Sequence, residues 1–360
     1  MEISPKLPAT IEPSGPVTAL APMQDVTTLP FMKLIGETGP PDWFFTEYFR
    51  VTEHSKPEPH IVSSITDHGT RRPVFAQLIG EAEEPLRRTV KALKGLPIAG
   101  IDLNLGCPAP KVYKKNVGGG LLRDVSEMRR VVSCLREAIP ETFTVKMRVG
   151  FADWEQFEEL LQVINDCEVD LLSLHGRTVH EGYKSAVHYD LIRKAADTVK
   201  CPLLANGEVS SVTKAVEVQK QVGGAGLMVG RAAIRNPWIF RQIRDHYSGR
   251  EVFRPTLGDV REYVDKIQVA TFKENHPDRL WNGRMKKFVN FVGTSIEPNG
   301  HFLYEMRRAR TTADLLKVCD RYMIEDGKSE IPYPEEPYPG LVARPNCETP
   351  EALSCSAQIA

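Results

Sequence analysis

One cysteine of this chain lies in a setting that suits proton transfer. Cys107 stands between Gly106 and Pro108, in a loop that follows the apolar run 100–104. An unperturbed thiol has a pKa of about 8.5, so it is largely protonated near neutrality and can act as an acid. A free cysteine more often serves as a small buried hydrophobe. We expect that role for the cysteines in helical or strand patterns, and the loop position favours a proton donor or nucleophile at residue 107. The cysteines expected to be buried are Cys134, Cys167, Cys201 and Cys319.

Charged and polar side chains end other apolar runs. Lys146 and Arg148 lie two residues apart in one run, so the two-residue period of a strand puts them on one face. An inward lysine must pair or bind an anion, because an unpaired buried charge is costly. A reduced flavin with negative charge at N1/O2 is a suitable anion, and an ion pair with Glu47 or Asp102 is the alternative. His175 ends another run, where a plain hydrogen-bonded histidine is the alternative.

Eight short apolar runs alternate with amphipathic stretches. The runs cover residues 17–23, 43–48, 74–80, 100–104, 144–148, 171–175, 202–207 and 226–230. Continuous apolar runs are typical of parallel strands that are buried on both faces. Eight repeats of strand and helix predict an α/β fold, a (β/α)₈ TIM barrel. The rival is an open doubly wound sheet, but the first run lacks the G-x-G-x-x-G turn of that fold.

The predicted barrel fixes where chemistry should take place. Active sites of TIM barrels lie at the carboxyl ends of the strands, and phosphate groups often bind after strands seven and eight. Asn206 and Gly207 follow the seventh run, and Gly230 and Arg231 follow the eighth. Backbone N–H groups, glycine and arginine are suitable ligands for a cofactor phosphate.

The strand pattern stops after Arg231, and helical patterns follow. We predict an N-terminal extension over 1–16, the barrel over 17–245, a small C-terminal all-helical domain over 246–328 and a disordered proline-rich tail over 329–360. Residues 281–310 hold six Lys and Arg against two Glu. Such a run is either one solvated helix face or a binding surface.

The composition indicates a water-soluble protein. Charged residues make up 26% of the 360 residues, and the net charge of −1 does not itself indicate a polyanionic partner. The seven cysteines form no C-x-x-C pair, so we expect neither a disulfide framework nor a metal site. We find no signal peptide and no membrane-spanning stretch, and expect a cytoplasmic protein with no membrane contact.

These motifs together resemble the tRNA-dihydrouridine synthases, which are FMN-dependent barrels followed by a small helical domain. The resemblance extends from about Val17 to Met323 and rests most on 106–108 (Gly-Cys-Pro) and 175–178 (His-Gly-Arg-Thr). Asp25 and Thr28 depart from the family pattern in the first loop, and Glu208 replaces its usual aspartate.

The resemblance implies a role for each matching residue. Cys107 corresponds to the proton donor of the family. Side chains that would face the uracil ring as substrate-binding groups are Asn104, Arg148, Arg177 and Tyr183. Contacts to FMN are implied for Pro22, Met23, Gln24, Gln77, Lys146, His175, Asn206, Gly207, Glu208, Gly230 and Arg231.

The implied reaction is a reduction in two parts. NADPH, or NADH, reduces FMN, and hydride then passes to C6 of a uracil base in tRNA while Cys107 gives its proton to C5. Lys146 would stabilise the anionic flavin, and the uridine would have to be flipped out of the folded RNA. Segment 46–51 resembles the branch of the family that acts on position 16 of the D-loop.

The resemblance also makes the basic residues candidate phosphate contacts. They are Lys114, Lys115, Arg284, Lys286, Lys287, Arg307 and Arg308. No obligate protein partner is evident. Two other functions stay open: a flavin-dependent dehydrogenase of a free pyrimidine or other small molecule, and a non-catalytic RNA-binding barrel.

Overall fold

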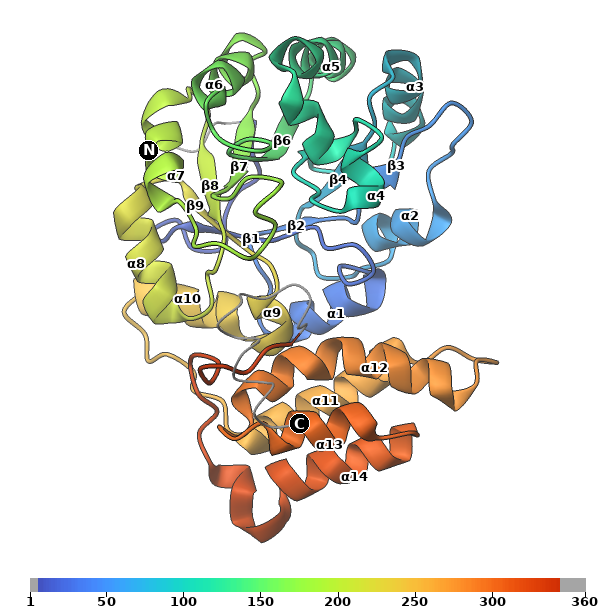
Figure 1. Cartoon of the computed structure of the whole chain (residues 1–360), viewed down its shortest axis with the longest axis vertical. Helices are drawn as coiled ribbons and strands as arrows, with labels where there is room; N and C mark the ends of the chain where they lie inside the picture. The colour runs from blue at the N-terminus through green and yellow to red at the C-terminus, as the bar shows by residue number, and fades with distance from the viewer. Residues whose placement is uncertain (1–5, 344–360) are drawn as a thin grey trace. The chain divides into compact units, whose positions relative to one another are not determined.

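Eight parallel strands close into a barrel in the computed structural model, which describes residues 6–343 (Figure 1). The order is β1, β2, β4, β5, β6, β7, β8 and β9, and β9 pairs with β1 to complete the ring. Short β3 (Phe49–Arg50) pairs with β4 beyond the end of β2. The prediction of a (β/α)₈ TIM barrel is therefore confirmed. The eight strands are β1 (Val17–Leu20), β2 (Trp43–Phe45), β4 (Val74–Ile79), β5 (Gly100–Leu105), β6 (Phe143–Arg148), β7 (Leu171–His175), β8 (Leu203–Asn206) and β9 (Gly226–Val229).

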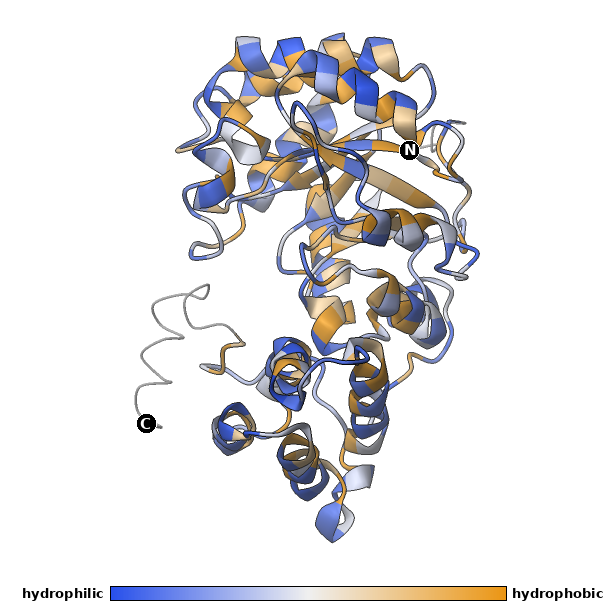
Figure 2. Cartoon of the chain, turned by 90° about the vertical axis from the view of Figure 1, so that its right-hand side faces the viewer, coloured by the Kyte–Doolittle hydropathy of each residue, from blue (hydrophilic) through white to orange (hydrophobic). Residues whose placement is uncertain are grey.

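The helices between the strands are amphipathic, and each turns an apolar face inward. In α3, for example, Leu86, Val90 and Leu93 are buried at helical spacing, while the charged residues between them face solvent. Figure 2 shows this division, with hydrophobic strands and mixed helices. The connecting helices are α1 (Leu29–Thr38), α2 (Pro59–Thr66), α3 (Glu83–Leu93), α4 (Pro110–Tyr113), η1 (Gly118–Arg123), α5 (Val125–Ala138), α6 (Phe157–Asp166), α7 (Tyr189–Thr198) and α8 (Val212–Val222).

The strand register brings the polar residues to one level of the barrel. Asn104 lies opposite Lys146, Arg148 lies opposite His175, and His175 lies opposite Asn206. Because all strands are parallel, these positions share the carboxyl end of the barrel. The residues predicted separately from four apolar runs therefore lie around one opening.

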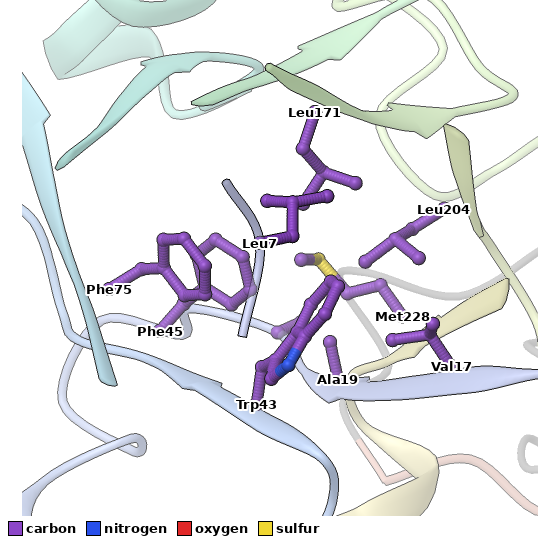
Figure 3. Close-up of a cluster of buried hydrophobic side chains, with 10 residues drawn as sticks. Leu7, Val17, Ala19, Trp43, Phe45, Phe75, Leu171, Leu204 and Met228 are labelled. Carbon is purple, nitrogen blue, oxygen red and sulfur yellow. The ribbon is translucent and has the colours of Figure 1, made fainter. Parts of the chain in front are cut away.

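The amino end of the barrel is closed by a hydrophobic cluster. Leu7, from the segment before β1, packs among the barrel residues Trp43, Phe75 and Met228 (Figure 3). The Lys6 carbonyl accepts a hydrogen bond of 2.8 Å from Thr142 Oγ1 and so anchors the segment. Part of the predicted N-terminal extension thus covers the amino end of the barrel.

A second compact unit is mainly helical and comprises, among the described residues, 37–39, 210–212 and 231–343. It begins before the predicted boundary at residue 246, because α9 already packs in this unit. Arg235 is buried and donates to Ser210 O at 2.7 Å and Ser295 Oγ at 3.1 Å, and Tyr263 Oη donates to the Ile234 carbonyl. Its helices are α9 (Ala232–Arg235), α10 (Ile239–Tyr247), α11 (Leu257–Thr271), α12 (Asp278–Val292), η2 (Gly293–Ser295), α13 (His301–Arg308), α14 (Thr312–Met323) and η3 (Glu325–Glu330).

The first part of the predicted disordered tail is ordered. Tyr333 is buried, and its hydroxyl donates to the Val292 carbonyl at 3.0 Å. The Tyr338 N–H donates to Thr294 O. The proline-rich composition suggested disorder, but one aromatic anchor holds this segment on the helices. The rest of the predicted tail, residues 344–360, lies outside the described residues. Across residues 6–343, no helix has both the length and the hydropathy needed to cross a membrane.

Candidate active site

The loop that carries Cys107 is held by the side chain of Asn104. Asn104 Oδ1, at the end of β5, accepts hydrogen bonds from the backbone N–H groups of Gly106 at 3.1 Å and Cys107 at 3.0 Å. The glycines of η1 pack directly against this loop. A Cβ on Gly119 would lie 3.0 Å from the Cys107 carbonyl oxygen and 2.6 Å from a methyl group of Val179. Only glycine permits this approach, so the run 118–120 supports the shape of the loop.

A chain of buried hydrogen bonds orients Asn104 from below. Thr144 Oγ1 and Gln77 Nε2 donate to the two carboxyl oxygens of Asp102, at 2.6 and 2.7 Å. Gln77 Oε1 then accepts from Asn104 Nδ2 at 2.8 Å, which turns Asn104 Oδ1 toward the Cys107 loop. Burial raises the pKa of Asp102 to about 6. Gln77, predicted as a cofactor contact, is thus fully buried and shares its amide between Asp102 and Asn104.

The thiol of Cys107 is partly buried, and burial raises its pKa. The group is therefore protonated at neutral pH, as a proton donor requires. A hydrogen bond from the hydroxyl of Tyr48 lowers the pKa of Cys107 and so opposes the effect of burial. The positive charges of Arg148 and Lys146 also lower this pKa. Tyr48 is buried just before β3, and the guanidinium of Arg50 lies 5.8 Å from the centre of its ring. We did not predict this tyrosine as a site residue, although it lies in the segment 46–51 that we compared with the family.

Lys146 lies inside the barrel, where its ammonium donates to Asn206 Oδ1 at 3.0 Å. Burial, reinforced by the charge of Arg148, lowers the pKa of Lys146 to about 8. Asp102 attracts the ammonium and partly offsets that shift. A cation desolvated in this way is stabilised by any anion that enters the mouth of the barrel, because a bound negative charge restores its preferred charged form.

Arg148 ties together the loops around the site. Its Nε donates to the Gly106 carbonyl at 2.9 Å, and its Nη1 donates to the carbonyls of Thr178 and Gly182, both at 2.8 Å. The guanidinium lies 5.2 Å from the centre of the Tyr183 ring. These contacts join the Cys107 loop to the loop after β7. Arg148 was predicted to face the substrate, and in the structure it also has this positioning role.

The loop after β7 contains three more predicted residues. The His175 ring packs edge-on against Tyr183, with ring centres 6.1 Å apart. Arg177 is fully buried, pairs with the carboxylate of Glu208 and donates from Nε to the Ser185 carbonyl at 2.7 Å. Its Nη1 has no hydrogen-bond partner among the described residues. A buried guanidinium with an unused donor is available to an acceptor that binds at the mouth.

The ends of β8 and β9 and the first loop form a cradle of backbone and small side chains. Gly207 and Glu208 both have positive φ angles, 131° and 48°, which turn the backbone sharply after Asn206. A Cβ on Gly230 would make only ordinary contacts with Ala21 and Met23 of the first loop. Glycines at strand ends in a barrel allow a phosphate to approach the backbone closely.

The first loop follows β1 and contains three predicted residues, Pro22, Met23 and Gln24. All three are partly exposed, and Gln24 Oε1 has no hydrogen-bond partner among the described residues. Asp25, one of the departures from the family pattern, donates its backbone N–H to the Glu47 carboxylate. Arg231 follows Gly230 directly but is assigned to the second compact unit, where it begins α9.

The residues present fit a flavin phosphate and its ring. The site offers a cradle for a phosphate, an ammonium for an anionic ring edge, unused polar atoms on Gln24 and Arg177, and a protonated thiol. This set can bind a planar anionic cofactor and donate one proton to a second molecule. The combination is that of an oxidoreductase that acts on an unsaturated substrate.

Comparisons with known proteins agree with this chemistry. A model of the Dihydrouridine synthase (Dus) family matches residues 19–292. A probable tRNA-dihydrouridine synthase of Helicobacter pylori is 36% identical over 295 residues, which cover 77% of this chain and 87% of that protein. The tRNA-dihydrouridine(16) synthase of Ralstonia nicotianae is 29% identical over 87% of this chain and 98% of its own length. The tRNA-dihydrouridine synthase B of Yersinia pestis is 35% identical over 62% of this chain and 70% of its own.

The fold, the site and these relatives together define a flavin-type oxidoreductase that modifies tRNA. The chain belongs to the dihydrouridine synthase family. Its reaction is the reduction of uridine in tRNA.

Proposed function

We propose that the chain uses FMN and NADPH to reduce the C5–C6 bond of a D-loop uridine, with position 16 as the target. The observation that carries the proposal is the placement of a partly buried, protonated thiol and a desolvated ammonium at the same end of one barrel. The position is supported by the 29% identity to a relative named for uridine 16, with matching length, and by segment 46–51 of the sequence.

The roles follow from the contacts of each side chain. FMN, when bound and reduced, supplies the hydride for C6. Cys107 donates its Sγ proton to C5, so its thiol becomes a thiolate. Lys146 would stabilise a negative charge on the cofactor ring, and the Asn206–Gly207 turn with Gly230 would hold its phosphate. We expect Asn104, Arg177 and Tyr183 to contact the uracil ring.

Tyr48 stabilises the thiolate that remains after proton transfer. Its hydrogen bond lowers the pKa of Cys107, so Tyr48→Phe should raise that pKa. Loss of one hydrogen bond of about 1 kcal/mol should slow uridine reduction roughly fivefold. The rate requires a protonated thiol and falls as pH rises through its pKa, so the alkaline limb should move to higher pH. Single-turnover rates measured against pH check this. A slower rate with an unmoved limb would mean a packing effect only.

Exposed basic residues supply the phosphate contacts to tRNA. Lys114 and Lys115 are exposed beside the Cys107 loop, and Lys287 and Arg308 are exposed in the helical unit. Two of the predicted contacts, Lys286 and Arg307, also bond within the protein. Lys286 Nζ donates to the carbonyls of Arg307 and Ala309, and Arg307 donates to Asn290 Oδ1 and the Val342 carbonyl. The Lys286 bonds cap the carboxyl end of α13, and the Arg307 bonds connect α13 to α12 and to Val342. Both side chains therefore help to hold the helical unit together.

Replacing Lys114 and Lys115 together with alanine should weaken tRNA binding and make it less sensitive to salt. Each phosphate contact releases counterions, and its loss lowers the slope of log Kd against log salt by roughly one. Binding titrations over several salt concentrations measure both effects. Lys286→Ala serves as a comparison that should leave the slope unchanged. An equal slope for the double variant and the wild type would exclude these lysines as contacts.

The decisive experiment is mass mapping of tRNA from cells that lack the gene. We expect dihydrouridine to disappear at position 16 and at no other position. Loss at another position would refute the assignment to position 16 while keeping the activity. Free uracil and orotate are assayed alongside unmodified tRNA, because turnover of the free bases alone would indicate the small-molecule dehydrogenase. Purified protein without flavin absorbance would support the non-catalytic alternative.

A further inference from the structure

We propose that the rim of the barrel beside Cys107 is a stacking surface for unpaired RNA bases next to the target uridine, with Trp154 as its main ring. The inference rests on the tRNA substrate proposed above. The rim consists of the loops 107–120, 150–156 and 176–188, which follow β5, β6 and β7. These strands are neighbours in the barrel, so the three loops leave the same end of it side by side.

The three loops pack into one continuous layer. The N–H groups of Val179 and His180 donate to the carbonyls of Gly150 and Phe151, both at 3.0 Å. On the other side, Gly119 lies between the Cys107 carbonyl and the Val179 side chain. A base bound on this layer would therefore be held on the same surface as the uridine over Cys107.

Trp154 is 45% exposed. Among the described residues of the barrel, no Phe, Tyr or Trp side chain is more exposed. It is nevertheless fixed in place. Its ring packs on His188 with centres 4.7 Å apart, and His188 Nε2 lies 2.8 Å from Glu181 Oε1. Glu181 also accepts the Thr178 N–H at 2.6 Å, and the Thr178 carbonyl accepts from Arg148. Hydrogen bonds thus connect the support of the indole ring to the candidate active site.

The loop that carries Trp154 is a tight, specific turn. A Cβ on Gly150 would lie 1.8 Å from the Asp153 carbonyl oxygen, so only glycine allows this turn to close. Asp153 Oδ1 accepts the Glu155 N–H at 3.0 Å and fixes the next peptide. The turn holds a large apolar ring that stays 45% exposed, with its contact to His188 tilted at 52°. We infer that the exposed part of the ring can stack with a planar ligand.

The surroundings of Trp154 favour a nucleic acid. Tyr113, Phe151 and His180 form a second ring group on the same layer, with Phe151 and His180 centres 4.6 Å apart. Arg123 lies 3.8 Å above the Phe151 ring. Exposed acidic groups near the rings are Asp153, which caps the turn, and Glu155. Exposed cations in the three loops are Lys111, Lys114, Lys115 and Lys184, and the exposed Arg123 lies just after the first of them. Rings interleaved with cations are typical of surfaces that bind single-stranded nucleic acid.

The test measures steady-state tRNA reduction by the flavin-loaded full chain, with tRNA transcribed without modifications. Base–aromatic stacking contributes enough that its loss should raise the KM for tRNA roughly 5- to 100-fold for Trp154→Ala, with kcat within about twofold. Trp154→Phe should keep most of the affinity, and Trp154→Leu should behave like the alanine variant. Ile11→Ala, at a residue of similar exposure near the amino end of the barrel, is the control and should bind tRNA normally.

Intrinsic fluorescence gives a second readout on the wild-type fold. The chain has four tryptophans, and the difference between wild type and Trp154→Phe isolates the emission of residue 154. We expect tRNA to quench that emission. Unchanged KM in Trp154→Ala, equal affinity of the leucine and phenylalanine variants, or emission that tRNA does not quench would each overturn the stacking surface. A wild-type enzyme that fails to reduce tRNA would instead refute the proposed function.

Discussion

Replacing Cys107 with alanine should reduce the rate of tRNA reduction by roughly 10²- to 10⁴-fold, the usual contribution of a general acid. The thiol is the protonated group of the loop, and burial keeps its pKa above the ordinary value. Alanine leaves C5 of the base without a nearby proton donor. The backbone N–H of residue 107 still bonds to Asn104, so the loop should keep its shape.

Two half-reactions separate the proposed role of Cys107 from a structural one. FMN should stay bound to Cys107→Ala, and NADPH should reduce it at the wild-type rate, whereas transfer to tRNA should be nearly abolished. Absorbance of the flavin during stopped-flow mixing follows both steps. Cys134→Ala removes a buried thiol from α5 and should leave both steps intact. Loss of the flavin from Cys107→Ala would contradict the assignment as proton donor.

Replacing Asp102 with leucine should also slow the reduction of uridine, although Asp102 itself does not touch the substrate. Leucine removes the acceptor for Gln77 Nε2 and Thr144 Oγ1, two fully buried donors. Each unsatisfied donor costs about 1–3 kcal/mol, so we expect a destabilisation of about 2–5 kcal/mol. The Gln77 amide would be free to rotate and would no longer fix Asn104. Uridine reduction should then fall roughly 100-fold, because the Cys107 loop loses its orientation.

Asp102→Asn is the matched variant, because asparagine can still accept from Gln77. It should keep most of the activity, and below pH 3.8 its free energy of unfolding should be near that of the wild type. The two proteins should differ in pH dependence. Between pH 3.8 and about 6 the folded wild type retains the Asp102 proton that the unfolded chain has lost. Its stability should therefore fall by about 2–3 kcal/mol as pH rises through this window, and the asparagine variant should lack that decrease.

Denaturant unfolding at several pH values measures these differences. Equal unfolding free energies for Asp102→Leu and the wild type would show that the buried hydrogen-bond chain does not stabilise the barrel. Full activity of Asp102→Leu would show that Asn104 keeps its orientation without Gln77. Either result would contradict the proposal that hydrogen bonds from Asp102 through Gln77 and Asn104 orient the Cys107 loop.

The barrel could be predicted from the sequence because its signal is local. Each buried strand is one uninterrupted apolar run, and the polar residue that ends each run marks the carboxyl end of the barrel. Cys107, Lys146 and Asn206 were found in this way, and the structure places Lys146 in hydrogen-bond contact with Asn206.

Other features depend on which residues closure of the ring brings together. Tyr48 approaches Cys107 from a different strand end, and nothing in its own segment shows that contact. Asp102 was considered only as a partner for Lys146, because the hydrogen bonds of Gln77 depend on the relative height of β4, β5 and β6. Tyr333 was missed for the opposite reason, since composition averages over a segment and hides one well-packed side chain.

Closure of the barrel also determines when β1 can find its second neighbour during translation. β1 can pair with β9 only after residues 226–229 have left the ribosome, and Leu7 can pack on Met228 only then. At roughly 5–20 residues per second, β1 waits about 10–40 seconds for its last neighbour. During that time the growing polypeptide presents two unpaired strand edges and an open hydrophobic end. Unpaired strand edges and exposed apolar surface favour association with other chains, so the growing chain is most open to aggregation late in translation.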